Sequence, residues 1–87
     1  MITSAQMRAA RALLGLSQQS LAERAGLSVP TIQRMEAAPG NVRGVIESLV
    51  KVIDALEASG IELIGEGTTS SGGGRGVRLR SNNSNPT

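Results

Sequence analysis

The chain has 87 residues, a mass of 8.9 kDa and a formal net charge of +2, a size that fits one small domain. It contains no Cys and no His, which excludes disulfides and thiolate metal sites and removes the usual acid–base side chain. It also lacks Phe, Tyr and Trp, so its core must be aliphatic and it offers no aromatic surface for stacking bases. We expect no enzymatic activity, no cofactor, no metal and no small-molecule ligand.

Most of the surplus positive charge lies close to the C-terminus. Arg75, Arg78 and Arg80 are three of the 9 basic residues, and without them the acidic residues are in slight excess. The charge balance alone therefore gives only weak support for a nucleic-acid partner. No apolar run approaches the roughly 18 residues of a membrane span, and no signal-peptide pattern opens the chain. We therefore expect a cytoplasmic protein without a membrane partner.

The first predicted helix runs from about Ser4 to Leu14, with Thr3 or Ser4 as its N-cap. Apolar residues at three- and four-residue steps mark its buried stripe. These residues are Met7, Ala10, Leu13 and Leu14. Gly15 is expected to end this helix.

Two shorter helices are predicted next. Ser17 caps a helix over Gln18–Ala25, which Gly26 ends at a position where a positive φ costs little. Ser28 then caps a third helix that carries Pro30 in its first turn. The inward positions of the two helices are Leu21, Ala22, Ala25, Ile32 and Met35.

A longer helix is predicted from about Val42 to Ser59, after a loop over 37–41. Its apolar surface is wider than one small core requires. The residues of this surface are Val45, Ile46, Leu49, Val50, Val52, Ile53 and Leu56. Two strands follow, 61–64 and 77–80, with one apolar face and one face on which Glu62 and Arg78 can pair.

The segment SQQSLAERAGLSVPTIQRME, Ser17 to Glu36, has the layout of a helix-turn-helix. Two short helices meet at a turn around Gly26, small Ala22 allows a close crossing, and Ile32 fills the space between the helices. The caps, the glycine and the inward positions all agree with this arrangement.

This segment, its entry RALLGLSQQSLAERAGLS and the later helix ESLVKVIDALE resemble Cro/cI-type (xenobiotic-response-element-type) helix-turn-helix regulators. The resemblance covers about residues 3–60. It implies a mainly α, lambda-repressor-like four-helix domain that binds double-stranded DNA, usually as a dimer, here with a C-terminal two-stranded extension. We expect the DNA-binding domain over 1–60, the extension over 61–80 with a flexible loop over 65–76, and a disordered tail over 81–87.

The N-terminal part of the second helix of such a motif can present side chains to base edges in the major groove. Here the candidates for base contacts are Ser28, Val29, Pro30, Thr31 and Arg34. Thr31 can hydrogen-bond or offer its methyl to thymine, and Arg34 can bind guanine O6 and N7 through its fork. The alternatives for Arg34 are a phosphate contact or a solvated surface charge.

Candidates for phosphate contacts lie on either side of that helix. Gln18 opens the preceding helix, where N–H groups favour anions, although it can also be simply solvated. The resemblance implies a phosphate contact for Arg43, whose alternative is a free surface charge. Asn41 in the same loop is a weaker candidate for a phosphate, and a cap of the long helix is favoured for it. The resemblance also implies a structural pair between Arg11 and Glu36, while Arg8 and Arg24 are expected to be exposed helix charges.

The glycines between 65 and 76 have two other readings. After a strand they could suggest a phosphate loop, but no helix follows them directly, so a flexible connector is favoured. Arg75 and Gly76 could alternatively belong to an arm that reaches DNA.

A two-stranded hairpin is marginal by itself, so the strands must pack on something. We expect a homodimer through the 42–59 helix and strands 61–64 and 77–80, with a monomer whose hairpin folds on that helix as the alternative. The favoured function is a repressor that binds a palindromic operator with helix 28–36 in the major groove. The alternative is an antitoxin or another protein-interaction module on the same fold.

Overall fold

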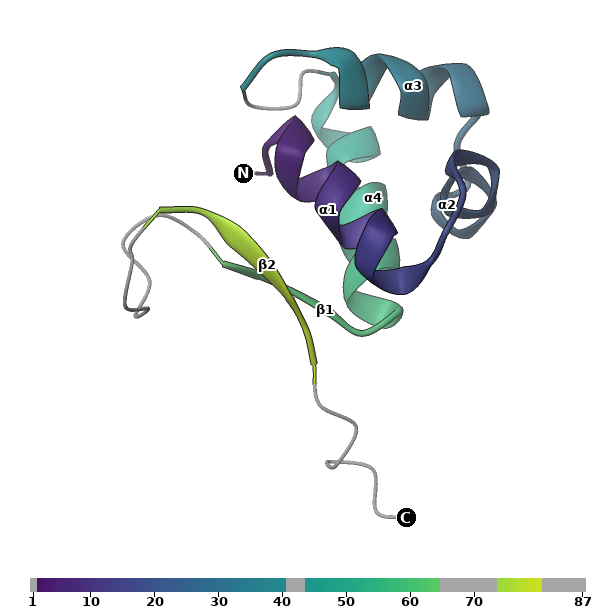
Figure 1. Cartoon of the computed structure of the whole chain (residues 1–87). Helices are drawn as coiled ribbons and strands as arrows, with labels where there is room; N and C mark the ends of the chain where they lie inside the picture. The colour runs from purple at the N-terminus through teal and green to yellow at the C-terminus, as the bar shows by residue number, and fades with distance from the viewer. Residues whose placement is uncertain (1, 41–43, 65–73, 81–87) are drawn as a thin grey trace.

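A computed structural model of the chain describes residues 2–40, 44–64 and 74–80 (Figure 1). The elements in chain order are α1 (Ser4–Leu14), α2 (Gln18–Ala25), α3 (Val29–Ala37), α4 (Ile46–Ala58), β1 (Ile61–Ile64) and β2 (Gly76–Leu79). The helices gather into one body, with α3 along one side, and the two strands lie beside α1 and α4 on the side away from α3 (Figure 1). The predicted small, mainly α fold with a two-stranded extension is confirmed.

Polar side chains begin the first three helices. The Thr3 side chain accepts a hydrogen bond from the Gln6 N–H at 3.0 Å, and Gln6 Oε1 accepts from the Thr3 N–H at 2.9 Å, which completes a capping box. Ser17 and Ser28 cap α2 and α3 through their hydroxyls, as predicted. These bonds satisfy N–H groups that a helix start otherwise leaves without an intrahelical acceptor.

Glycine ends α1 and α2. Gly15 and Gly26 have φ angles of 69° and 70°, in the left-handed region that side chains other than glycine enter at a cost. A Cβ at either position would meet no atom within 4 Å, so the requirement for glycine comes from the backbone alone.

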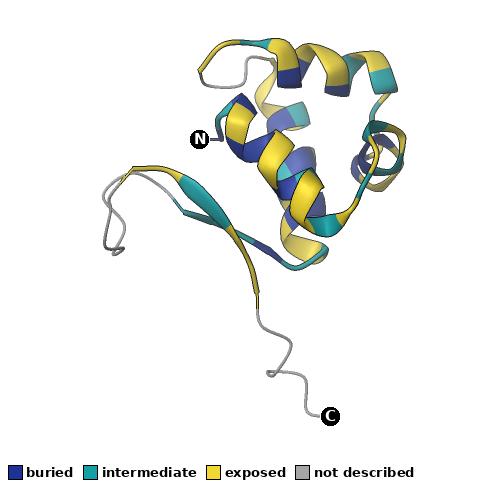
Figure 2. Ribbon diagram, viewed as in Figure 1, coloured by how far each residue is buried: buried dark blue, intermediate teal, exposed yellow. Residues whose placement is uncertain are grey.

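The core is aliphatic, as expected, and every helix contributes to it (Figure 2). Its buried members are Ile2, Met7, Ala10, Leu21, Ala22, Ala25, Ile32, Met35, Leu49, Val52, Ala55, Leu56 and Ile61. One position of the predicted α1 stripe is wrong, because Leu13 is 48% exposed. Met7, Ala10 and half-buried Leu14 form the inward stripe, which turns the side chain of Leu13 to solvent. Ile2, which precedes the first helix, is buried although no helical pattern marks it.

The predicted start of the long helix is also wrong. α4 begins at Ile46 rather than near Val42, because Gly44 has a φ of 155° and Val45 is extended (φ −72°, ψ 145°). Val45 is the N-cap and makes no side-chain cap hydrogen bond. Asn41 and Arg43, the predicted phosphate contacts, lie outside the described residues.

The antiparallel pair of β1 and β2 has the register Ile61–Leu79, Glu62–Arg78, Leu63–Val77 and Ile64–Gly76. On its outer face Arg78 Nη2 lies 2.8 Å from Glu62 Oε1. The hairpin is held to the helical body by buried Ile61 and by Gln6, whose Nε2 donates to the carbonyls of Ile64 at 3.1 Å and Gly76 at 2.8 Å. In a single chain the strands therefore pack on α1 as well as on α4.

Candidate nucleic-acid interface

α2, the turn and α3 have helix-turn-helix geometry. After α2, the Leu27 N–H donates to the Ala22 carbonyl at 2.9 Å, which closes the turn around Gly26. Ala22 of α2 and Ile32 of α3 are both buried in the aliphatic core, and the two helices contact each other. α3 consequently lies across one side of the body with a long face turned to solvent (Figures 1 and 2).

The two faces of α3 are clearly divided. Its buried side consists of Ile32, Met35 and Glu36. Its exposed side chains are Pro30, Gln33, Arg34 and Ala37. Among the predicted base-contacting residues, Ser28, Pro30 and Arg34 are exposed and Thr31 is half-buried, whereas Val29 packs against the edge of the core. Arg34 is therefore the charged group of this outward face.

Gln33 belongs to the same exposed face, although it is not among the predicted base-contacting residues. It lies three residues after Pro30 and directly before Arg34, so helical spacing alone could have found it. An amide of this kind can form a bidentate pair with adenine in the major groove.

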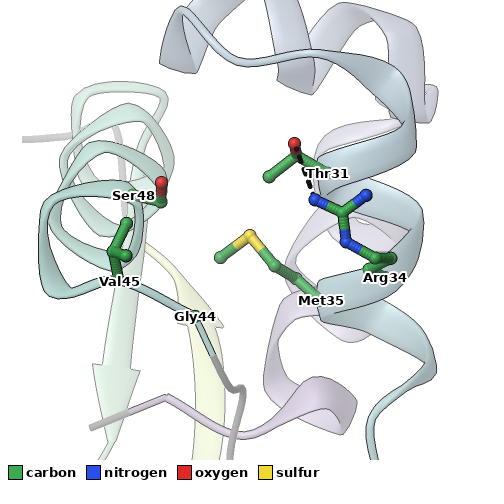
Figure 3. A pocket seen from close by; sticks show the side chains of 6 residues that line it. All are labelled: Thr31, Arg34, Met35, Gly44, Val45 and Ser48. Atoms are coloured by element: carbon green, nitrogen blue, oxygen red, sulfur yellow. Dashed lines mark hydrogen bonds between the residues drawn. The ribbon is translucent and has the colours of Figure 1, made fainter.

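The hydroxyls on the first turns of α3 connect to Arg34. Ser28 Oγ and Thr31 Oγ1 lie 2.9 Å apart. Figure 3 shows the next bond, in which Arg34 Nη2 donates to Thr31 Oγ1 at 3.3 Å. A pocket of about 300 Å³ lies next to these side chains, between α3 and the start of α4. It is lined by Thr31, Arg34, Met35, Gly44, Val45 and Ser48 (Figure 3).

Below the outward face, a buried carboxylate ties three helices together. Arg11 from α1 donates Nε to Glu36 Oε2 at 2.7 Å and Nη2 to Oε1 at 2.9 Å, a bidentate pair. Gln18 from α2 donates Nε2 to Glu36 Oε1 at 3.0 Å. The Glu36 side chain is only 4% exposed, so the pair fixes how α3 lies against α1 and α2.

Burial acts to raise the pKa of Glu36. The hydrogen bonds from Arg11 and Gln18, together with the charges of Arg11 and Arg8, outweigh burial and lower that pKa from its ordinary value. The bond to Glu36 in turn raises the pKa of Arg11. Both side chains therefore stay charged at neutral pH.

Three side chains make hydrogen bonds that the sequence does not predict. The Gln18 amide donates one of its two N–H groups to Glu36, and its phosphate contact stays a prediction. Arg8 and Arg24 are exposed, as predicted, and each also donates a hydrogen bond to another element. Arg8 donates to the Glu36 carbonyl at the end of α3, and Arg24 Nη1 donates to Ser59 Oγ at 2.9 Å.

Comparison with known families agrees with this geometry. A family model described as Helix-turn-helix matches residues 7–62, a span that contains α2, α3 and α4 complete. No curated protein matches the chain. None of the helices in the described part of the chain is long and apolar enough to cross a membrane. The chain belongs to the Cro/cI-type helix-turn-helix family of DNA-binding transcription regulators.

Proposed function

We propose that this regulator is a repressor that binds a palindromic operator as a homodimer, with α3 of each copy in the major groove. The observation that carries the proposal is the outward face of α3, where Arg34 stands exposed among small or uncharged side chains. A helix fits the major groove, and base pairs there present distinct patterns of donors and acceptors. Arg34 is accordingly the residue to which we assign guanine recognition.

The other contacts follow from position on the motif. Ser28 provides a hydroxyl at the N-terminal end of α3, and the Thr31 methyl, Pro30 and the accessible part of Val29 offer apolar contact to thymine methyl groups. The first N–H groups of α2, at Gln18, and the side chains of Asn41 and Arg43 are assigned to phosphates. Phosphate contacts of this kind set the register of the protein but carry no sequence information.

The dimer is assigned to the outer stripe of α4 and to the hairpin. Ile46 is 69% exposed, Val50 is 45% exposed and Val45 is 65% exposed, although all three are aliphatic. These residues exceed what the core of one copy uses, and a second copy would remove them from water. A twofold axis through this surface presents two copies of α3 to two half-sites of an inverted repeat.

Repression would result from occupation of the operator by the dimer. A dimer that covers two half-sites, one helical turn of about 34–36 Å apart, excludes other proteins from that stretch of DNA. Bound at a promoter, it blocks the assembly of RNA polymerase.

The test is selection of fragments from a genomic DNA pool at two salt concentrations. Wild type, Arg34→Ala and the matched control Arg24→Ala are compared, because both variants remove one exposed positive charge. We expect wild type and Arg24→Ala to enrich the same inverted repeat, and Arg34→Ala to lose that preference. Weak binding that salt abolishes, with no fragment enriched, would contradict operator recognition and favour the protein-interaction module.

A further inference from the structure

We propose that the Thr31 hydroxyl is a positioning group for Arg34: it holds the guanidinium in the orientation in which Arg34 reads a base. This inference rests on the proposed function, since it concerns how α3 recognises DNA. It assigns to Thr31 a role that differs from a direct base contact, because the hydroxyl acts on DNA through Arg34.

The contacts around Thr31 leave its oxygen well fixed. Thr31 Oγ1 lies 2.9 Å from Ser28 Oγ and accepts from Arg34 Nη2 at 3.3 Å. Ser28 is itself held as the N-cap of α3, where its Oγ accepts from the Thr31 N–H at 3.3 Å. A β-branched side chain such as Thr31 has few rotamers in a helix. The acceptor presented to Arg34 is therefore more rigid than the long side chain that it holds.

Counting hydrogen-bond donors shows that this arrangement leaves Arg34 able to read DNA. Arg34 has five N–H donors, and the contact with Thr31 uses one of them, while a bidentate guanine pair needs two. The two hydroxyls of Ser28 and Thr31 have one proton each, and the bond between them uses one. One hydroxyl proton thus remains on the outward face for a further contact.

Orientation matters more for a base than for a phosphate. A guanine pair requires the guanidinium plane to align with the base edge, whereas attraction to phosphate is mainly a matter of charge. An exposed arginine that samples many rotamers also loses more freedom on binding than one already held in place. Loss of the Thr31 hydroxyl should therefore reduce discrimination between bases more than it reduces nonspecific affinity.

The experiment uses the selected operator and a set of its single-base variants. Arg34→Ala first identifies the base pair that Arg34 reads, as the position where discrimination falls by roughly tenfold or more. Thr31→Val, which keeps the shape but removes the hydroxyl, is then compared with Thr31→Ser, which keeps the hydroxyl but removes the methyl. The double variant Thr31→Val/Arg34→Ala completes a double-mutant cycle. Thr31→Ala serves as a second hydroxyl-free variant, and thermal unfolding shows that each variant is folded.

We expect Thr31→Val to lose severalfold discrimination at the base pair that Arg34 reads, and Thr31→Ser to retain it. The double variant should be no worse than Arg34→Ala. Unchanged discrimination in Thr31→Val and Thr31→Ala would overturn the inference, as would an additive loss at a different base pair, which would make Thr31 a direct reader. If wild type itself selects no fragment, the proposed function fails and this inference fails with it, an outcome distinct from the other two.

Discussion

Glu36 is the buried side chain through which α3 is hydrogen-bonded to both α1 and α2. Its carboxylate is almost fully buried and receives donors from Arg11 and Gln18, whereas Glu62 pairs with Arg78 on the exposed face of the hairpin. Exposed pairs contribute about 0–1 kcal/mol, and removal of one partner from a buried pair costs about 3–5 kcal/mol. The two pairs have similar lengths, 2.7 Å and 2.8 Å, so burial rather than distance separates their effects.

The lowered pKa of Glu36 makes a signed prediction for pH dependence. Because its pKa is lower in the folded than in the unfolded state, its contribution is present above the unfolded value of about 4.3 and disappears as pH falls through the folded value. We expect Glu36→Gln to be less stable than wild type at pH 7 and the difference to shrink towards pH 3. Urea unfolding at several pH values measures this, with Glu62→Gln as the control that follows wild type. Parallel loss of stability in wild type and Glu36→Gln would contradict the assignment.

Ser4 gives a second prediction at this scale. Its hydroxyl is buried and contacts the carbonyls of Met35 and Ala38, at the C-terminal end of α3. Ser4→Ala removes the donor and leaves those carbonyls poorly satisfied, which should cost about 1–3 kcal/mol. Ser20→Ala, whose hydroxyl bonds to exposed Ser17, should change the free energy of unfolding by less than about 0.5 kcal/mol. Equal losses in the two variants would show that burial of Ser4 is unimportant.

At the scale of the elements, the sequence predicts a helix end correctly where a single residue determines the local backbone conformation. Ser17, Ser28, Gly15 and Gly26 set the helix ends where they were expected, because a cap or a left-handed φ acts within one turn. The start of α4 is placed too early because its apolar residues follow a helical pattern from Val45, whereas Val45 itself is extended and acts as the N-cap.

For a related reason, the sequence predicts the positions of the candidate side chains only in part. Helical spacing identifies which residues of α3 point outward, and Arg34 follows from it. The inward turn of the Gln18 amide could not be predicted, because it depends on a carboxylate 18 residues away in sequence. The burial of Ile2 and the hydrogen bonds from Gln6 to both strands are likewise results of tertiary packing.

Gln6 links α1 to the hairpin and supplies a prediction for these elements. Its Nε2 donates to the carbonyls of Ile64, the last residue of β1, and Gly76, the first residue of β2. In Gln6→Ala those carbonyls lose their donor, so the β1 and β2 amides should exchange hydrogen faster while amides of α2 stay protected. Gln19→Ala, which alters an exposed glutamine on α2, is the control. Unchanged exchange in the strands would show that apolar packing holds the hairpin without Gln6.

For the whole molecule, the outer face of α4 exposes apolar side chains that do not pack into the core of a single copy. The proposed dimer predicts a molar mass of twice 8.9 kDa by size exclusion with light scattering at micromolar concentration. Val50→Lys should yield the monomer, because a charge on the outer stripe of α4 has to be buried on association. Leu13→Lys changes a residue of similar exposure on α1 and should leave the dimer intact. A wild-type molar mass of 8.9 kDa would show that the protein is a monomer and would contradict the proposed dimer.

The central claim is that α3 lies in the major groove with Arg34 against guanine. The most direct test is protection of guanine N7 from dimethyl sulfate on the selected operator, since N7 faces the major groove. We predict protected guanines in two half-sites about one helical turn apart, loss of that protection with Arg34→Ala, and its retention with Arg24→Ala. Binding without N7 protection, or protection that Arg34→Ala leaves unchanged, would contradict the account.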